Sequence, residues 1–227
     1  MSVGDWGKTI VMQSRLQDHS GVEVRDGTFY YQGRHIINRY SSINGGVCMG
    51  EGQREAFFID FDDGTCPLAS DLYGRVIKDM VDQRKGDCSD DDLALRLTYE
   101  HIKEAMPFGN VRFLKELLKR FDRAYGLLND KTIPIDAFIA NNVAVCRHYA
   151  VASAGILERL SEHHLIDGTA RVNRNSMYLG GHAWCRYERK DGQVDIVDIM
   201  QEFQGPLKDS LKDAKWFYSR PDDDLLK

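Results

Sequence analysis

The chain has 227 residues, of which 42% are hydrophobic and 29% are charged, and its net charge is -5 at pH 7. This composition is typical of a globular protein with a sizeable core, and the negative charge argues against nucleic acid or an anionic membrane as a partner. The sequence contains no apolar run that predicts a membrane-spanning helix, and residues 1–20 lack the apolar centre of a signal peptide.

The five cysteines are spread along the chain and include no CxxC pair. An odd number of widely spaced cysteines argues against a disulfide framework and for a reducing compartment. We therefore expect a cytoplasmic protein, or one delivered into the cytosol of another cell. The cysteines are Cys48, Cys66, Cys88, Cys146 and Cys185.

The first 88 residues are expected to form a β-rich N-terminal region. Residues 27–40 are rich in aromatic and β-branched side chains and follow the turn signal Asp26-Gly27, which indicates a hairpin. Residues 56–61, AFFIDF, are typical of a short buried strand. The pattern leaves open whether residues 1–88 form an accessory unit or belong to the same domain as residues 89–227.

Two helices are predicted next. Ser89, with Asp92 three residues later, resembles a capping box, and apolar residues recur at helical spacing until Pro107. A second helix is expected over residues 111–128. The residues predicted to face inward are Leu93, Leu95, Leu97, Ile102 and Met106 in the first helix, and Phe113, Leu114, Leu117, Leu118, Phe121 and Tyr125 in the second.

Residues 141–160 predict a third helix that begins near Cys146. Small and apolar side chains recur along this segment with the period of a buried helix. A cysteine at a helix N-terminus experiences the partial positive charge of the first-turn amides, which stabilises the thiolate over the thiol. Cys146 is therefore a candidate nucleophile.

Three antiparallel strands are predicted after this helix, over residues 169–173, 181–189 and 193–199. Lys190-Asp191-Gly192 supplies the turn between the second strand and the third. Helices followed by antiparallel strands indicate an α+β fold.

His182, on the second strand, is the candidate base for the thiol. A thiol is activated by a base within hydrogen-bond reach, and that base needs an acceptor on its other ring nitrogen. His148 is closer in sequence, but two residues along a helix turn the side chain by about 200°, away from Cys146. The two glycines before His182 and the tryptophan after it set this histidine apart from the others.

Asp198 is the candidate acceptor, and the hairpin register decides its orientation. If Lys190-Asp191-Gly192 forms a three-residue turn, Asp198 lies on the same face as His182 and diagonally next to it. If Asp191 and Gly192 alone form the turn, Asp195 shares that face instead, but roughly 20 Å along the strand. Asp198 is thus the one aspartate of this strand within reach.

The segments around these three residues resemble the motifs of the transglutaminase-like superfamily of papain-fold cysteine enzymes. VCRHYA contains Cys146, GHAW contains His182 and IVDI contains Asp198, in the chain order of that family. The similarity covers about residues 110–200. It departs from the usual pattern in having Ala144 where the family has Gly, and Ile199 where the family has Pro.

The resemblance implies a papain-like core in which the helix headed by Cys146 packs on the antiparallel sheet. It also implies that Cys146 is the nucleophile, that His182 is the base and later the acid, and that Asp198 holds the imidazole. Attack on a carboxamide or peptide carbonyl would form a thioester and release ammonia or an amine. We therefore expect a protease, deamidase or transglutaminase that acts on a protein or peptide and needs no cofactor.

Three further residues are candidates around this triad. The backbone amide of Cys146 would bind the oxyanion together with a side-chain donor, for which Asn142 or Asn141 is a candidate. Trp184 is a candidate for shaping the substrate groove.

Two other readings use the same residues. A catalytically silent fold of this family would act as a protein-binding module, with residues 1–88 as its docking surface. A zinc site drawn from Cys146, His148, His182 and Cys185 is disfavoured, because residues three apart on a strand point to opposite faces. No metal is predicted.

Overall fold

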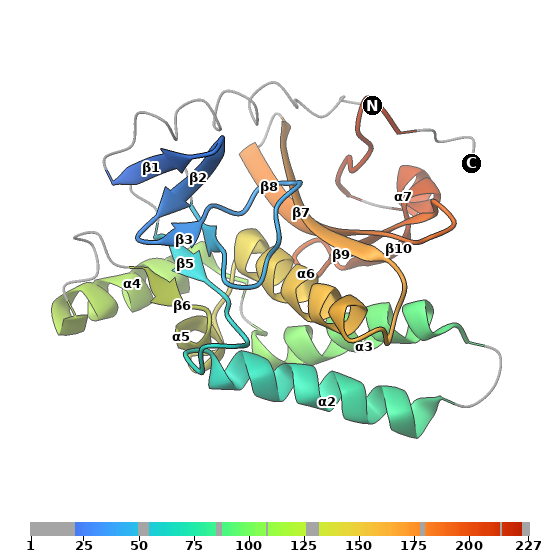
Figure 1. Ribbon diagram of the computed structural model, residues 1–227, viewed down its shortest axis with the longest axis horizontal. Helices are drawn as coiled ribbons and strands as arrows, with labels where there is room; N and C mark the ends of the chain where they lie inside the picture. The colour runs from blue at the N-terminus through green and yellow to red at the C-terminus, as the bar shows by residue number, and fades with distance from the viewer. Residues whose placement is uncertain are drawn as a thin grey trace.

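Helix α6 (Cys146–Glu162) lies against one face of a four-stranded antiparallel sheet (Figure 1). The computed structural model is an α+β structure and describes residues 21–49, 55–84, 88–107, 109–125, 132–177, 180–213 and 215–223. The strands of this sheet follow the order β10-β9-β8-β7, and their bounds are Thr169–Met177 for β7, Gly180–Glu188 for β8, Val194–Asp198 for β9 and Phe203–Pro206 for β10.

The sheet separates two hydrophobic clusters because side chains along a strand alternate between its faces. Ala183, Cys185 and Tyr187 of β8 belong to the main core, which also contains the buried side of α6. The opposite face carries a smaller cluster, over which the short helix α7 (Leu207–Asp213) and part of the C-terminal segment lie. The smaller cluster consists of Trp184, Ile196, Leu207 and Tyr218.

A three-residue turn joins β8 to β9, as predicted. The backbone amide of Arg189 donates to the carbonyl of Gln193 at 2.8 Å, and the amide of Gly192 donates to the carbonyl of Arg189 at 2.9 Å. Gly192 has a φ of +85°, in the left-handed region that favours glycine.

The pairing that follows from this turn places Asp198 on the face of His182. Strands β8 and β9 pair with Cys185 opposite Val197, and one further residue in this register brings Trp184, two residues from His182, level with Asp198. Asp195 stands opposite Tyr187, on the other face. The predicted register is therefore confirmed.

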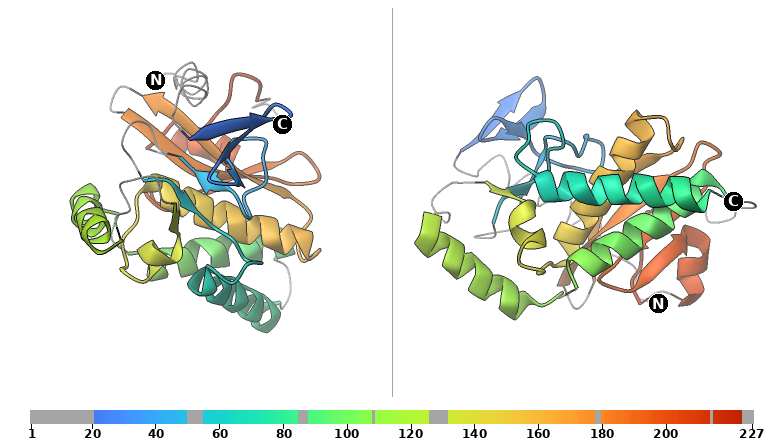
Figure 2. Two further views of the ribbon diagram at one scale, coloured as in Figure 1. Left: turned by 60° about the vertical axis from the view of Figure 1, so that its left-hand side comes forward. Right: turned by 90° about the horizontal axis from the view of Figure 1, so that it is seen from below.

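Two helices cover the side of α6 that faces away from the sheet (Figures 1 and 2). They are α2 (Pro67–Gln83) and α3 (Asp90–Ala105), and α3 packs on both α2 and α6. The predicted cap of α3 is confirmed, because the Ser89 hydroxyl accepts a hydrogen bond from the Asp92 amide at 3.1 Å. All five residues predicted to face inward from this helix are buried.

The expectation of a β-rich region up to residue 88 is wrong for residues 67–83, which form α2. Pro67 in the first turn suits a helix start, because proline has no amide hydrogen to leave unpaired there. The helix buries an apolar stripe at helical spacing, made of Ala69, Leu72, Val76 and Met80.

Helix α4 (Val111–Tyr125) forms where the sequence predicts it. Its apolar stripe is narrower than expected: Phe113 is 55% exposed, so its predicted inward orientation is wrong. The Tyr125 side chain lies outside the described residues. The residues that pack against the core are Leu114, Leu117, Leu118 and Phe121.

The strands before residue 89 are short. The predicted Asp26-Gly27 turn is confirmed, since it joins the first two strands of a three-stranded sheet. A second sheet pairs β4 with β5 in antiparallel fashion and β5 with β6 in parallel, and the short helix α5 (Asp136–Ile139) follows β6. The bounds are β1 Val22–Arg25, β2 Thr28–Tyr31, β3 Arg34–His35, β4 Val47–Cys48, β5 Phe57–Phe58 and β6 Ile133–Pro134.

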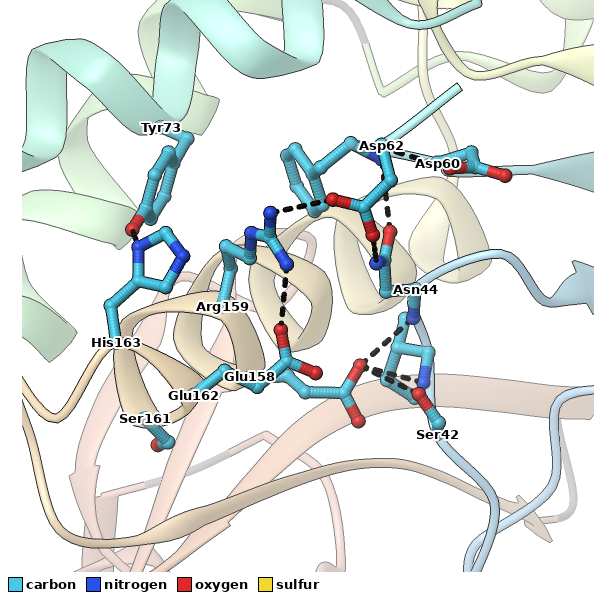
Figure 3. Close-up of polar contacts among 12 residues, drawn as sticks. Ser42, Asn44, Asp60, Asp62, Tyr73, Glu158, Arg159, Ser161, Glu162 and His163 are labelled. Atoms are coloured by element: carbon cyan, nitrogen blue, oxygen red, sulfur yellow. Dashed lines mark hydrogen bonds and ion pairs between the residues drawn. The ribbon is translucent and has the colours of Figure 1, made fainter. Parts of the chain in front are cut away.

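Polar contacts tie this N-terminal part to the second half of α6 (Figure 3). The Glu158 carboxylate accepts from the backbone amides of Ile43 and Asn44, each at 2.8 Å. Arg159 donates to the Asp62 carboxylate at 2.6 Å. The described residues before position 89 also contribute to the main hydrophobic cluster, so they share one core with the rest of the chain.

Candidate active site

Cys146 is the first residue of α6 and is partly exposed. The preceding Val145 is extended, with φ of -131° and ψ of 174°, and its amide donates to the Nδ1 atom of His148 at 3.0 Å. The chain thus turns from an extended segment into the helix at the sulfur-bearing residue. The partial positive charge at a helix N-terminus favours a thiolate over a thiol at this position.

His182 and Asp198 meet beside this sulfur. Nε2 of His182 lies 2.5 Å from Oδ2 of Asp198, and both side chains are buried. Asp198 ends strand β9, and its carboxylate accepts two further hydrogen bonds: from the Gln201 amide at 3.1 Å and from the Tyr218 hydroxyl at 2.8 Å. With three partners, the carboxylate is held in one orientation.

The pKa values of Cys146 and His182 are shifted in opposite directions. Burial by itself would raise the pKa of the Cys146 thiol, but the hydrogen bond and charge of His182, together with the Ala183 amide, lower it below the ordinary value. Burial would lower the pKa of His182, but Asp198 and Cys146 raise it to about 9. Because Nε2 faces Asp198, Nδ1 is the ring nitrogen that faces the sulfur. These shifts favour a thiolate–imidazolium pair near neutral pH.

Three other cysteines are shifted the opposite way. Burial raises the pKa of the thiols of Cys48, Cys66 and Cys185. These residues are buried, and they act as small apolar side chains of the core. The lowered pKa of Cys146 therefore comes from His182 and from the Ala183 amide, which the other three cysteines lack.

Aromatic side chains enclose the imidazole of His182. The Trp216 ring lies 4.8 Å from it, centroid to centroid, and the Trp184 ring stacks at 6.1 Å. Trp184 is 1% exposed and packs on Tyr218, so it cannot form the wall of an open groove, and the role in shaping a substrate groove expected for it is wrong. Its place is under the histidine rather than beside a substrate.

The two asparagines predicted as oxyanion donors lie between α5 and α6. The side-chain amide of Asn141 donates to the Ala137 carbonyl at 2.8 Å. Asn142 is exposed and has a φ of +54°, so it turns the chain from one helix towards the next. The Asn141 contact and the Asn142 backbone conformation both shape the connection between the helices. The oxyanion role of either residue stays a prediction.

A second polar network lies on the other side of Cys146. His148 is fully buried, its Nε2 lies 3.2 Å from Oε1 of Glu55, and its ring stacks on Phe138 at 4.0 Å. Arg147 binds the same Glu55 carboxylate in a buried ion pair. Nδ1 accepts from the Val145 amide, so the histidine caps the helix. The described polar contacts of His148 are thus with Val145 and Glu55.

Burial sets the ionisation of this second network. It lowers the pKa of His148, and the charge of Arg147 lowers it further against the opposing effect of Glu55, giving about 4. Burial would raise the pKa of Glu55, but His148 and Arg147 lower it to about 2. Glu55 is thus an anion paired with Arg147, and His148 is neutral.

Sequence reasoning missed Glu55, Trp216 and Tyr218, which complete the two networks. Glu55 precedes a strand without a recognisable motif, and Trp216 and Tyr218 lie in a polar segment beyond the last predicted strand. Within the described residues, no group of three or more His, Cys, Asp or Glu side chains is placed to hold a metal ion. None of the described helices has the length and apolar character needed to cross a membrane.

Comparisons with protein-family models, with curated proteins and with solved structures gave no match for this chain. The chemistry of the site is therefore inferred from its own residues.

Proposed function

We propose that the protein is a cysteine-dependent enzyme of the transglutaminase-like kind that hydrolyses or transfers an amide group of a protein or peptide. The observation that carries this proposal is the Cys146–His182–Asp198 arrangement, in which a partly exposed thiol of lowered pKa meets an imidazole whose pKa is raised to about 9. The motif order and the helix packed on an antiparallel sheet support the same reading.

The reaction follows from the charges of the pair. The Cys146 thiolate attacks the carbonyl carbon of the amide, and the carbonyl oxygen becomes an oxyanion next to the first-turn amides of α6. The proton on Nδ1 of His182 moves to the leaving nitrogen as the C–N bond breaks, which leaves a thioester and releases ammonia or an amine. His182 then takes a proton from water or a second amine, which attacks the thioester and frees the thiolate.

Asp198 has a positioning and electrostatic role in this scheme. Its bond to Nε2 presents Nδ1 to the sulfur, and its charge stabilises the imidazolium. Removing the carboxylate charge leaves the thiol and imidazole in place but weakens the ion pair between them.

The first test is the rate of iodoacetamide labelling of Cys146 against pH, resolved by site with mass spectrometry. We expect wild-type Cys146 to label with a midpoint well below the ordinary thiol pKa of about 8.5, and His182→Ala to shift that midpoint back up. Cys88 is exposed and serves as an internal reference in every sample. If Cys146 labels slowly at every pH and His182→Ala changes nothing, the proposal fails and the protein-binding reading replaces it.

The second test asks which amide is used. Incubation with glutamine-containing peptides separates the outcomes, because released ammonia marks attack on a carboxamide and new peptide N-termini mark cleavage of the backbone. Cys146→Ala is the control that must abolish either product. Incorporation of an added primary amine would distinguish transfer from hydrolysis.

A further inference from the structure

The C-terminal segment crosses the side of the sheet that carries His182 and Asp198. We call residues 216–223 the C-terminal strap. Tyr218 belongs to the small hydrophobic cluster of this face, and Trp216 packs against that cluster. The strap therefore lies over His182 and Asp198, the two residues that activate the thiol in the proposed mechanism.

Tyr218 contacts Asp198 through a specific atom. Its hydroxyl donates to Oδ2 at 2.8 Å, and Oδ2 is also the atom that lies 2.5 Å from Nε2 of His182. Tyr218 is 1% exposed, and burial together with the charge of Asp198 raises its pKa, so the hydroxyl keeps its proton. One carboxylate oxygen thus accepts from both the imidazole and the phenol.

Asn175 holds the strap at the histidine. It stands directly opposite His182 in the pairing of β7 with β8, and it is buried. Its Oδ1 atom accepts from the Trp216 indole at 2.7 Å, and its amide nitrogen donates to the Phe217 carbonyl at 2.7 Å. The side chain therefore clamps two consecutive residues and keeps the indole over the imidazole.

The far end of the strap is anchored as well. Arg220 donates through two nitrogens to Oδ1 of Asn173, at 2.8 and 2.6 Å. Asp223 accepts two hydrogen bonds from the buried Arg186, at 3.1 and 2.6 Å. Because both ends are fixed, Tyr218 between them has little freedom to move away from Asp198.

We infer that the C-terminal strap is a positioning element of the proposed active site, in which Tyr218 fixes the Asp198 carboxylate and Trp216 shields the His182–Asp198 hydrogen bond from water. Both residues act through the dyad and not on substrate. The inference rests on the proposed function, and it adds to the site residues that lie up to 20 positions beyond Asp198 in the sequence. A hydrogen bond in a site without water is stronger than one in contact with water.

Packing alone does not account for these contacts. A phenylalanine at position 218 would fill the same apolar space, so the hydroxyl adds only the bond to Asp198. Likewise, an apolar residue at position 175 would leave the sheet pairing of β7 intact and remove only the clamp. The two side chains can therefore be tested without changing the sheet that carries His182 and Asp198.

The experiment measures the pKa of His182 from the pH titration of its imidazole proton signals by NMR, in Tyr218→Phe and Asn175→Ala. In Tyr218→Phe the carboxylate shares its charge with one donor fewer and holds the imidazolium more firmly, so we expect the pKa of His182 to rise. In Asn175→Ala the strap is released and water reaches the dyad, so we expect that pKa to fall towards its ordinary value. Tyr40→Phe, at an exposed tyrosine, is the control.

Iodoacetamide labelling of Cys146 in the same variants gives the second readout. We expect the labelling rate at pH 7 to change by about threefold to tenfold in both, the size expected from the net contribution of one ordinary hydrogen bond. A His182 pKa equal to that of wild type in both variants overturns the strap inference. A wild-type Cys146 with an unshifted labelling profile overturns the proposed function instead, so the two failures are distinguishable.

Discussion

The two sides of Cys146 each contain a buried histidine beside a carboxylate, yet their pKa values move apart. On one side His148 neighbours Glu55, and its pKa is about 4. On the other side His182 neighbours Asp198, and its pKa is about 9. Burial alone would lower both pKa values, so burial does not explain the difference.

The difference lies in the other charges near each histidine: Cys146 helps to raise the pKa of His182, whereas Arg147 lowers that of His148. Glu55 is neutralised by the buried Arg147, so His148 lies next to an ion pair whose net charge is zero. Asp198 is bonded to neutral donors, and its charge remains available to stabilise an imidazolium. A histidine–carboxylate contact therefore indicates a charged histidine only after the other partners of the carboxylate have been considered.

Breaking the Glu55 network should give the largest effect on stability. In Glu55→Ala the buried Arg147 loses its counter-ion, and we expect the free energy of unfolding to fall by about 3–5 kcal/mol. Urea denaturation measures this change. The exposed Glu23, replaced by alanine, is the matched control and should cost well under 1 kcal/mol.

The double variant Glu55→Gln/Arg147→Gln tests whether charge is the cause. Both ions are then removed together, so no uncompensated charge is buried, and we expect a smaller loss than in Glu55→Ala. A loss as large as that of the single variant would contradict the electrostatic explanation and indicate lost packing instead.

The next largest effect should be a loss of stability in acid, which comes from His148 and not from His182. The folded pKa of His148 lies below its ordinary value of about 6.5, so the unfolded chain binds the extra proton and stability falls as the pH drops from 6.5 towards 4. Between pH 7 and 4.5 this residue should cost about 2 to 3 kcal/mol, because each pH unit between the two pKa values is worth about 1.4 kcal/mol.

His148→Gln should remove this slope while keeping a side chain that can cap the helix. Urea denaturation at several pH values measures it. The pH range ends at 4.5 because Glu55, whose folded pKa is about 2, adds its own loss of stability only below its ordinary value of about 4.3. An unchanged slope in His148→Gln would show that His148 is not the acid-sensitive group.

The Cys146–His182 pair should give no such slope between about pH 6.5 and 8.5. By itself, the raised pKa of His182 would contribute stability that is present below pH 6.5 and lost as the pH rises through 9. The lowered pKa of Cys146 contributes with the opposite sign. Because the proton that leaves the thiol is carried by the imidazole, the folded and unfolded chains bind the same number of protons.

Asp198→Asn should have the smallest effect of these changes, and the effect should appear in the reactivity of Cys146 rather than in the free energy of unfolding. Without the carboxylate charge we expect the pKa of His182 to fall towards about 6.5 and Cys146 labelling at pH 7 to slow by about tenfold, equivalent to about 1.4 kcal/mol. Asp191→Asn, in the exposed turn of the same hairpin, is the control. Unchanged labelling in Asp198→Asn would mean that the neutral amide orients the imidazole equally well.

Local sequence patterns were enough to predict the elements that carry Cys146, His182 and Asp198. The spacing of apolar residues predicts α6 with Cys146 at its start, and the period of two along β8 and β9 predicts which aspartate faces His182. The remaining partners are brought in by the tertiary fold. Glu55 reaches Arg147 across 92 positions, and no motif marks either residue for the other. The same holds for Trp216 and Asn175, which are 41 positions apart.

The sequence predictions that fail do so where an apolar pattern fits two structures. The spacing in α2 is helical, but the aromatic strands before it suggested that the whole segment was β-rich. Phe113 matches an amphipathic helix and is 55% exposed, because α4 contacts the core along a narrow stripe. Whether a side chain is buried depends on the elements that pack against its helix, and the apolar pattern of that helix alone carries no information about them.

The exposed turn at Lys190-Asp191-Gly192 has a consequence for evolution. Surface turns normally tolerate insertions and deletions, but a loss of one residue here would move every later side chain of β9 to the opposite face. Such a descendant would keep its cysteine, histidine and aspartate motifs in order, and still its aspartate would no longer reach the histidine. If the proposed function is correct, the length of this turn should therefore be inherited as strictly as Cys146 itself.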